Sequence, residues 1–193
     1  MHEQLSKQLR LYIDPSPEAE SFFHSLFRVR KLKRRQQLLQ EGDVYTHSSY
    51  VVSGILRLYA IDKNGFEHII QFAPSGWWIG DMNSLLHQQP GNLYIDAVED
   101  SELLQISRQE LEILLQRYPE FESYFRRLAE NAVAAYQQRI LSILSLPARE
   151  RHLQFLQLYP NLAPRLPQKY IASYIGVTPE FLSKLLSQPA SAK

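Results

Sequence analysis

The sequence predicts an α+β protein in which an antiparallel barrel or jelly roll is followed by a long helix and a helix-turn-helix. Short runs of β-branched and aromatic residues alternate with glycine-containing turns between residues 29 and 107, which is typical of such a barrel. Apolar residues then recur every three or four positions from 119 to 146. The segment 168–187 has small, glycine and apolar residues at the spacing of two helices that cross through a short turn.

Composition excludes several classes of protein. The chain has 193 residues, and its hydrophobic content of 45% is sufficient for a core. It has no cysteine, so disulfides, thiolate nucleophiles and cysteine-ligated metal centres are excluded. No apolar run approaches the ~20 residues that span a membrane, and residues 1–10 lack the apolar stretch of a signal peptide, so we expect a cytoplasmic protein.

The charge is distributed unevenly along the chain. Residues 147–193 carry a net charge of +4, whereas residues 1–146 carry −3. A basic end on a slightly acidic body is typical of a DNA-binding module attached to a module that does not bind DNA.

Two short helices are predicted before the strands. Apolar residues follow helical spacing over 3–13, until prolines interrupt the pattern, and Ser16 is placed to cap a second helix over 17–27. The next run, 28–35, has six basic residues in eight. We interpret it as the solvated side of a first strand with Val29 and Leu32 facing inward; the alternative is a second surface for DNA or another anionic partner.

Turns divide the region that follows into short strands. Asp62-Lys63-Asn64-Gly65 predicts a hairpin, because Asn-Gly readily adopts positive φ. We interpret Trp77 and Trp78 as core or subunit-contact residues, the alternative being the lining of a pocket. The strands are predicted within 37–43, within 49–61 with a break at Ser53-Gly54, and at 66–72, 94–98 and 103–106.

A long helix is predicted after the strands. Ser107 and Glu110 form a capping box for a helix that ends near Tyr118, and Pro119 starts a second helix over 119–146. An apolar stripe of this length needs a partner, and a parallel helix of a second subunit is the simplest one, so we expect a homodimer through residues 119–146. The alternative is that the stripe packs on its own barrel. A short helix over 148–158 and a proline-rich connection follow.

The segment 168–187 satisfies the requirements of a helix-turn-helix. Ala172 is small where the two helices approach, and Gly176 provides the turn. Thr178 can cap the second helix, and Pro179 occupies its first position, where no backbone N–H is needed. The apolar residues expected on the facing surfaces are Ile171, Ile175, Val177, Leu182 and Leu185.

This motif predicts a set of DNA contacts. The second helix enters the major groove, where Glu180 can accept from a cytosine amino group and Lys184 can contact a guanine or a phosphate. The start of the first helix contacts the DNA backbone. The predicted DNA-binding residues are Gln168, Lys169, Thr178, Pro179, Glu180, Ser183, Lys184 and Ser187.

In this order of parts the chain resembles the Crp/Fnr family of regulators. The resemblance rests on Glu41-Gly42-Asp43, 51–59, 65–70, Gly80-Asp81 and 177–184. It implies a cyclic-nucleotide-binding-like β-roll (1–118), a dimerisation helix (119–146) and a winged helix-turn-helix domain (147–193). It also implies a sequence-specific DNA-binding transcription regulator.

The recognition helix departs from the family pattern. In the family a Glu and a following basic residue read bases, and Glu180 and Lys184 match those positions, but the Arg often found before the Glu is Pro179 here. Only residues 189–193 follow the helix, so we expect no C-terminal wing. The alternative function is a ligand-binding or protein-interaction module with a vestigial helix-turn-helix.

The effector site departs further. Members that bind cyclic AMP have Gly-Glu followed by Arg-Ser or Arg-Thr, where the arginine neutralises the phosphate. Here the two pairs are Gly80-Asp81 and Gly91-Asn92, and no Arg or Lys lies between Asp81 and Gln105. The nucleobase side has Tyr136-Gln137 in place of small hydroxyl residues. We therefore expect an unidentified effector or none, and not cyclic AMP. The candidate pocket residues are Gly80, Asp81, Met82, Asn83, Gly91, Asn92, Tyr136 and Gln137.

The sequence provides no support for catalysis. Walker, nucleophile-elbow and dinucleotide-binding motifs are absent. The six histidines share no metal-ligand spacing, so we expect no metal and no cofactor.

Overall fold

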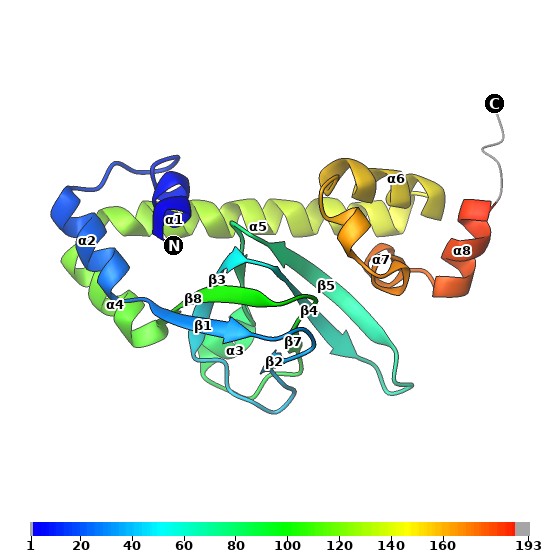
Figure 1. The fold of residues 1–193 in the computed structure, drawn as a ribbon, viewed down its shortest axis with the longest axis horizontal. Coiled ribbons are helices and arrows are strands. Elements are labelled where there is room, and N and C mark those ends of the chain that lie inside the picture. The colour runs from blue at the N-terminus through cyan, green and yellow to red at the C-terminus, as the bar shows by residue number, and fades with distance from the viewer. Residues whose placement is uncertain (1, 188–193) are drawn as a thin grey trace.

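The computed structural model describes residues 2–187 and contains two four-stranded antiparallel sheets that face each other as a β-roll (Figure 1). One sheet has the strand order β1-β8-β3-β6 and the other β2-β7-β4-β5. The predicted α+β class and antiparallel roll are confirmed. The strands are β1 (Arg28–Leu32), β2 (Gln37–Leu39), β3 (His47–Ser53), β4 (Ile55–Ile61), β5 (Glu67–Pro74), β6 (Trp78–Ile79), β7 (Tyr94–Ala97) and β8 (Ser101–Ser107).

Helices lie at both ends of the roll. The longest, α5, runs past the roll from the N-terminal helices at one end to the C-terminal helices at the other (Figure 1). The helices are α1 (His2–Leu9), α2 (Pro17–Ser25), α3 (Met82–His87), α4 (Arg108–Arg117), α5 (Glu120–Ser145), α6 (Ala148–Leu158), the 3-10 turn η1 (Ala163–Arg165), α7 (Gln168–Ile175) and α8 (Pro179–Ser187). Residues 188–193, for which we predicted no wing, lie outside the described residues.

Two glycines turn the chain where the sequence predicted turns. Gly54 has a φ of +91° and connects β3 in one sheet to β4 in the other; a Cβ there would lie 2.1 Å from the Ser101 Oγ. Gly65 has a φ of +84° in the hairpin between β4 and β5, where Ile61 pairs with Glu67. Only a residue without a Cβ fits Gly54 without moving its neighbour.

Side-chain caps begin the helices as predicted. The Ser16 Oγ accepts from the Ala19 N–H at the start of α2. Ser107 and Glu110 form a complete capping box at the start of α4. The sequence did not predict α3, which begins where the Asp81 carboxylate accepts from a backbone N–H.

The prediction for β1 was wrong at one position. Leu32 is buried (2% exposed), but Val29 is 48% exposed. Side chains alternate between the two faces of a strand, so residues three positions apart cannot both face inward. Arg30, two positions before Leu32, therefore lies on the same face of the strand as Leu32, but its side chain is exposed.

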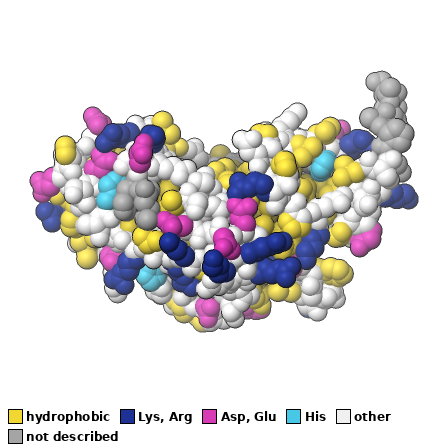
Figure 2. Space-filling model, viewed as in Figure 1, with side chains coloured by type: hydrophobic (Ala, Val, Ile, Leu, Met, Phe, Trp, Pro, Cys, Tyr) yellow, Lys and Arg dark blue, Asp and Glu magenta, His cyan; other side chains and the backbone are white. Residues whose placement is uncertain are grey.

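The apolar stripe of α5 divides into two parts. Phe121 and Tyr124 are buried, and Phe125 and Leu128 also pack into a cluster formed with the N-terminal helices. From residue 129 onward the stripe is exposed, and Leu144 is 80% exposed. Figure 2 shows hydrophobic side chains at the surface around α6, which lies beside this end of α5. The alternative that the stripe packs on its own protomer therefore holds only for its first two turns.

One hydrophobic core connects the roll to the C-terminal helices. It contains Ile69 and Phe72 of β5 together with Phe155, Ile171 and Leu182 of three C-terminal helices. The rings of Phe72 and Phe155 lie 6.1 Å apart, edge to face. This core fixes the position of α7 and α8 relative to the β2-β7-β4-β5 sheet.

Candidate functional site

Helices α7 and α8 form the predicted helix-turn-helix. Ala172 is fully buried between them, and Gly176 has a φ of +73° in the turn. The Val177 N–H donates to the Ala172 O at 3.0 Å and closes the turn. The predicted facing residues are confirmed: Ile171, Ile175 and Leu182 are buried, and Val177 and Leu185 are partly buried in the same cluster.

The start of α8 has the predicted cap. The Thr178 Oγ1 accepts from the Phe181 N–H at 3.2 Å, and Pro179 is the first residue of the helix. A capped N-terminus orients the first turn of α8 and leaves its outer side chains unobstructed.

The predicted DNA-binding residues lie on the outer side of the motif. All eight are exposed, whereas Leu182 in the middle of α8 is buried. We call six of them the base-reading face: Thr178, Pro179, Glu180, Ser183, Lys184 and Ser187. The other two, Gln168 and Lys169, begin α7.

Phe181 is a residue that the sequence reasoning missed. It lies between members of the base-reading face and is 50% exposed. An exposed phenylalanine on a recognition helix suits apolar contact with a thymine methyl group. Its signal in the sequence was its position directly after Glu180, in the first turn of the recognition helix.

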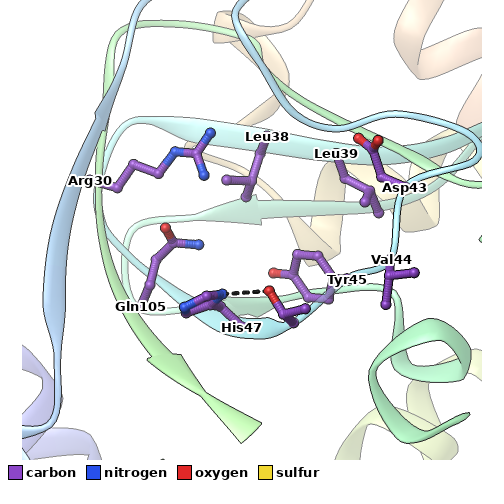
Figure 3. A pocket seen from close by; sticks show the side chains of 9 residues that line it. Arg30, Leu38, Leu39, Asp43, Val44, Tyr45, His47 and Gln105 are labelled. Atoms are coloured by element: carbon purple, nitrogen blue, oxygen red, sulfur yellow. Dashed lines mark hydrogen bonds between the residues drawn. The ribbon is translucent and has the colours of Figure 1, made fainter. Parts of the chain in front are cut away.

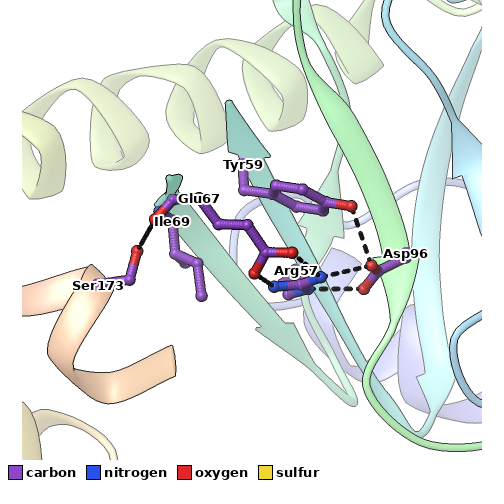
Figure 4. Close-up of polar contacts among 6 residues, drawn as sticks. All are labelled: Arg57, Tyr59, Glu67, Ile69, Asp96 and Ser173. Carbon is purple, nitrogen blue, oxygen red and sulfur yellow. Dashed lines mark hydrogen bonds and ion pairs between the residues drawn. The ribbon is translucent and has the colours of Figure 1, made fainter. Parts of the chain in front are cut away.

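The helix-turn-helix is attached to the edge of the roll by hydrogen bonds. The Ser173 hydroxyl donates to the Glu67 O at 2.6 Å and accepts from the Ile69 N–H at 2.9 Å (Figure 4). Arg139 of α5 donates to the Ile69 O, the Ile70 O and the Tyr174 O. These bonds satisfy the outer edge of β5, which would otherwise present unpaired backbone groups.

A buried arginine lies beside this attachment (Figure 4). Arg57 is 4% exposed, and its guanidinium donates to the Asp96 carboxylate at 2.8 and 2.7 Å and to both oxygens of Glu67. Its charge is also sandwiched between two rings, 4.0 Å from Tyr59 and 4.1 Å from Tyr170 of α7. Such contacts stabilise a desolvated cation.

The electrostatics of this cluster follow from its burial. Burial by itself would lower the pKa of Arg57, but the hydrogen bonds and charges of Asp96 and Glu67 outweigh it and hold this pKa above its ordinary value. Burial raises the pKa of Tyr59 to about 12, so its hydroxyl stays protonated and donates to Asp96. The sequence reasoning missed this cluster, whose one signal is an arginine inside the apolar strand 55–61.

We call the pairs Gly80-Asp81 and Gly91-Asn92 the cassette. Its two glycines and Asp81 come together, but the chain's own groups fill the space between them. The Asp81 carboxylate is buried and accepts from the Ser84 N–H at 3.0 Å. A Cβ on Gly91 would lie 2.3 Å from the other oxygen of Asp81, and a Cβ on Gly80 would lie 2.6 Å from the Tyr45 ring. A side chain at position 91 therefore has no room in this arrangement.

The remaining predicted pocket residues lie apart from this contact. Met82, Asn83 and Asn92 are exposed. The Tyr136 hydroxyl donates to the Gln71 Oε1 at 3.3 Å. Within residues 2–187, no hydrogen bond or ion pair joins Tyr136 or Gln137 to Gly80, Asp81 or Gly91. The described chain also has no group of three His, Asp or Glu side chains placed to hold a metal ion.

Comparison with known proteins is consistent with this arrangement. Residues 29–118 match the family model of the cyclic nucleotide-binding domain. The chain is 27% identical over 175 residues to the fumarate and nitrate reduction regulatory protein of Vibrio cholerae, covering 83% of this chain and 68% of that protein. It is 26% identical to the regulatory protein HlyX of Actinobacillus pleuropneumoniae, covering 83% and 71%.

Solved structures share the fold. FixK2 from Bradyrhizobium japonicum superposes with a TM-score of 0.74 at 20% identity, covering 84% of this chain and 83% of that one. The Thermus thermophilus catabolite activator protein gives 0.57 at 27% identity, covering 89% and 82%.

The roll, the long helix, the exposed helix-turn-helix and these relatives define a DNA-binding transcription regulator. Residues 29–118 match the cyclic nucleotide-binding domain, and over most of its length the chain is similar to regulators of the Crp/Fnr family. The named relatives are regulators rather than enzymes. In the part of the chain that is described, no helix is long and apolar enough to cross a membrane.

Proposed function

We propose that this regulator is a cytoplasmic homodimer that reads DNA sequence with the base-reading face of α8. The observation that carries this proposal is the division of α8 into two sides. Leu182 is buried and Leu185 half-buried against α7, whereas every member of the base-reading face is exposed. A recognition helix needs this division, because one side must pack while the other enters the major groove.

Replacing both Glu180 and Lys184 by alanine is expected to lower affinity for the cognate DNA about 100-fold. Each base-specific contact contributes about 1–3 kcal/mol, and two such contacts are removed. Both side chains are exposed, so the fold is expected to survive. A gel-shift assay at fixed salt, with a target selected from random DNA by the unaltered protein, measures the change.

A matched control removes an acid and a base elsewhere. Glu3 and Lys7 form an exposed ion pair on α1, at the opposite end of α5 from α8 (Figure 1). The variant with Glu3→Ala and Lys7→Ala is expected to bind as the unaltered protein does. Absence of any DNA preference, or no loss in the Glu180/Lys184 variant, would leave a ligand-binding or protein-interaction module with a vestigial helix-turn-helix. A shallow salt dependence of DNA binding would also favour that module, because phosphate contacts release counterions.

We also propose that the cassette does not bind cyclic AMP. Position 91 is a glycine that offers no guanidinium, and the neighbouring Asp81 carboxylate caps α3. A cyclic phosphate placed there would face a carboxylate in a buried space, which is unfavourable without a cation. Isothermal titration calorimetry with cyclic AMP and cyclic GMP is expected to show no binding up to millimolar ligand. Micromolar binding of either nucleotide would overturn this proposal.

The exposed part of α5 supports the dimer. Ile140, Leu141, Ile143 and Leu144 leave large apolar surfaces uncovered within one turn and a half. The two recognition helices of a dimer contact two half-sites of DNA. The dimer therefore binds DNA more tightly and reads a longer target sequence than one protomer does. The domain boundaries predicted at 118 and 146 are part of this proposal.

A further inference from the structure

A cavity of about 210 Å³ opens at the mouth of the roll, between β1 and the segment that leads from β2 into β3 (Figure 3). None of the candidate cassette residues lines it. Its lining residues are Arg30, Leu38, Leu39, Asp43, Val44, Tyr45, Thr46, His47 and Gln105. Tyr45 separates the cavity from the cassette, because its ring packs on Gly80 while the same side chain lines the cavity.

Arg30 is the cation of this cavity. It lies on the same face of β1 as Leu32, and its exposed side chain lines the cavity. The other basic residues of the strand have carboxylate partners, Arg28 with Glu110 at 3.5 Å and Lys31 with Glu102 at 3.6 Å. The Arg30 guanidinium has no hydrogen bond or ion pair to another side chain or to the backbone among the described residues. An arginine directed into a cavity without a carboxylate partner is suited to bind an anion through its two parallel N–H groups.

The floor of the cavity is polar and held in place. Gln105 is buried, and its Nε2 donates to the Ser49 Oγ at 2.9 Å. The same Ser49 Oγ lies 2.8 Å from the Tyr45 hydroxyl, which donates to the Ile79 O. This chain of buried groups fixes the carboxamide of Gln105, which Figure 3 places between Arg30 and His47. Fixed polar groups at a cavity floor orient a ligand with little loss of entropy.

The other side of the cavity has the opposite charge. Asp43 lines it from the loop after β2, next to an apolar wall that includes Leu38 and Leu39 (Figure 3). The carboxylate accepts from the Gln40 N–H at 3.1 Å, which fixes its position in the turn. A ligand that fits must therefore present an anion to Arg30 and a hydrogen-bond donor to Asp43.

We propose that this cavity binds a small carboxylate-bearing metabolite with a donor group at its other end, such as an α-amino acid or a hydroxy acid. The volume is below the range of drug-sized ligand pockets and accommodates a molecule of this size. A nucleotide is too large for it.

The cavity adjoins the start of the helices that lead toward the DNA-binding end. The Thr46 O accepts from the Arg108 N–H at 3.2 Å, and His47 pairs with Ser107, the N-cap of α4. A ligand that contacts Thr46 and His47 therefore touches the segment where α4 begins, and α5 follows α4 directly. In this role as effector site the cavity rests on the proposed function.

Isothermal titration calorimetry of the full chain tests the binding. The probes are the twenty L-amino acids, lactate and malate as hydroxy acids, acetate as a carboxylate without a donor, and inorganic phosphate. At least one amino or hydroxy acid is expected to bind at least ten-fold more tightly than acetate or phosphate. Arg30→Gln is expected to lower the affinity for that ligand at least ten-fold. Lys31→Gln, on the opposite face of the same strand, is the matched control and is expected to leave it unchanged.

The outcomes separate this inference from the proposed function. No binding by any probe, or equal weakening by Arg30→Gln and Lys31→Gln, overturns the site, provided that thermal melting shows both variants folded. Acetate or phosphate binding as tightly as the best amino or hydroxy acid overturns the role of Asp43. DNA affinity is measured separately without ligand, so a regulator that fails to bind DNA leaves the calorimetric result standing.

Discussion

Replacing Arg57 by methionine is expected to lower the free energy of unfolding by about 3–5 kcal/mol. Methionine has a similar length but leaves the buried Asp96 carboxylate without its cation. It also removes the charge that lies between the rings of Tyr59 and Tyr170, one from the roll and one from α7. The cost is large because a buried charge that loses its partner keeps its desolvation penalty.

Chemical denaturation, followed by circular dichroism at fixed protein concentration, measures this loss. Arg28→Met is the control, because Arg28 is exposed and its pair with Glu110 contributes at most about 1 kcal/mol. A loss of less than about 1 kcal/mol for Arg57→Met would contradict the role of the cluster.

Burial opposes the ionised form of Glu67, but Arg57 outweighs it and lowers the Glu67 pKa. The stabilisation from Glu67 is therefore present above its unfolded pKa and is lost as the pH falls through the lower, folded value.

Replacing Ile140 and Leu144 by glutamate is expected to raise the dissociation constant of the dimer by more than about 100-fold. Both side chains are exposed in the protomer, so the protomer is expected to keep its fold. In a dimer that buries this stripe, each carboxylate would be desolvated without a partner, which costs several kcal/mol. Affinity for a two-half-site DNA is expected to fall in parallel, because one protomer contacts one half-site.

Sedimentation velocity over a range of concentrations measures the association. The matched control is Asn131→Glu with Gln138→Glu, two exposed positions on the side of α5 away from Ile140, Leu141 and Leu144. This variant is expected to remain dimeric. If the Ile140 and Leu144 variant also remained dimeric, the exposed stripe would not be the subunit contact.

The features that the sequence predicted are local. The hairpin at Gly65, the capping box at Ser107 and the turn at Gly176 each depend on a few consecutive residues whose backbone preferences act alone. The helix-turn-helix was predictable for the same reason, since its packing residues lie within twenty positions. The exposed and buried sides of α8 follow directly from that spacing.

The features that the sequence did not predict depend on pairing between distant strands. Arg57 meets Glu67 ten positions away and Asp96 thirty-nine positions away, and only the order of β7, β4 and β5 brings them together. The position of Arg30 beside the cavity likewise depends on the pairing of β1 with β8. At Gly91 the sequence showed the missing arginine, but the nearby Asp81 carboxylate became evident only from the fold.

The shared core between β5 and the C-terminal helices limits how this protein can be recombined. Ile69 and Phe72 belong to the roll by sequence, but C-terminal side chains cover them. A chimaera that exchanges the C-terminal helices for those of another regulator must also adapt the residues of β5 that pack against them, and the new helices must supply a hydroxyl in place of Ser173 for the Glu67 O and the Ile69 N–H. A new DNA specificity is therefore more readily obtained by substitutions on the outer side of α8 than by exchange of the whole helix pair.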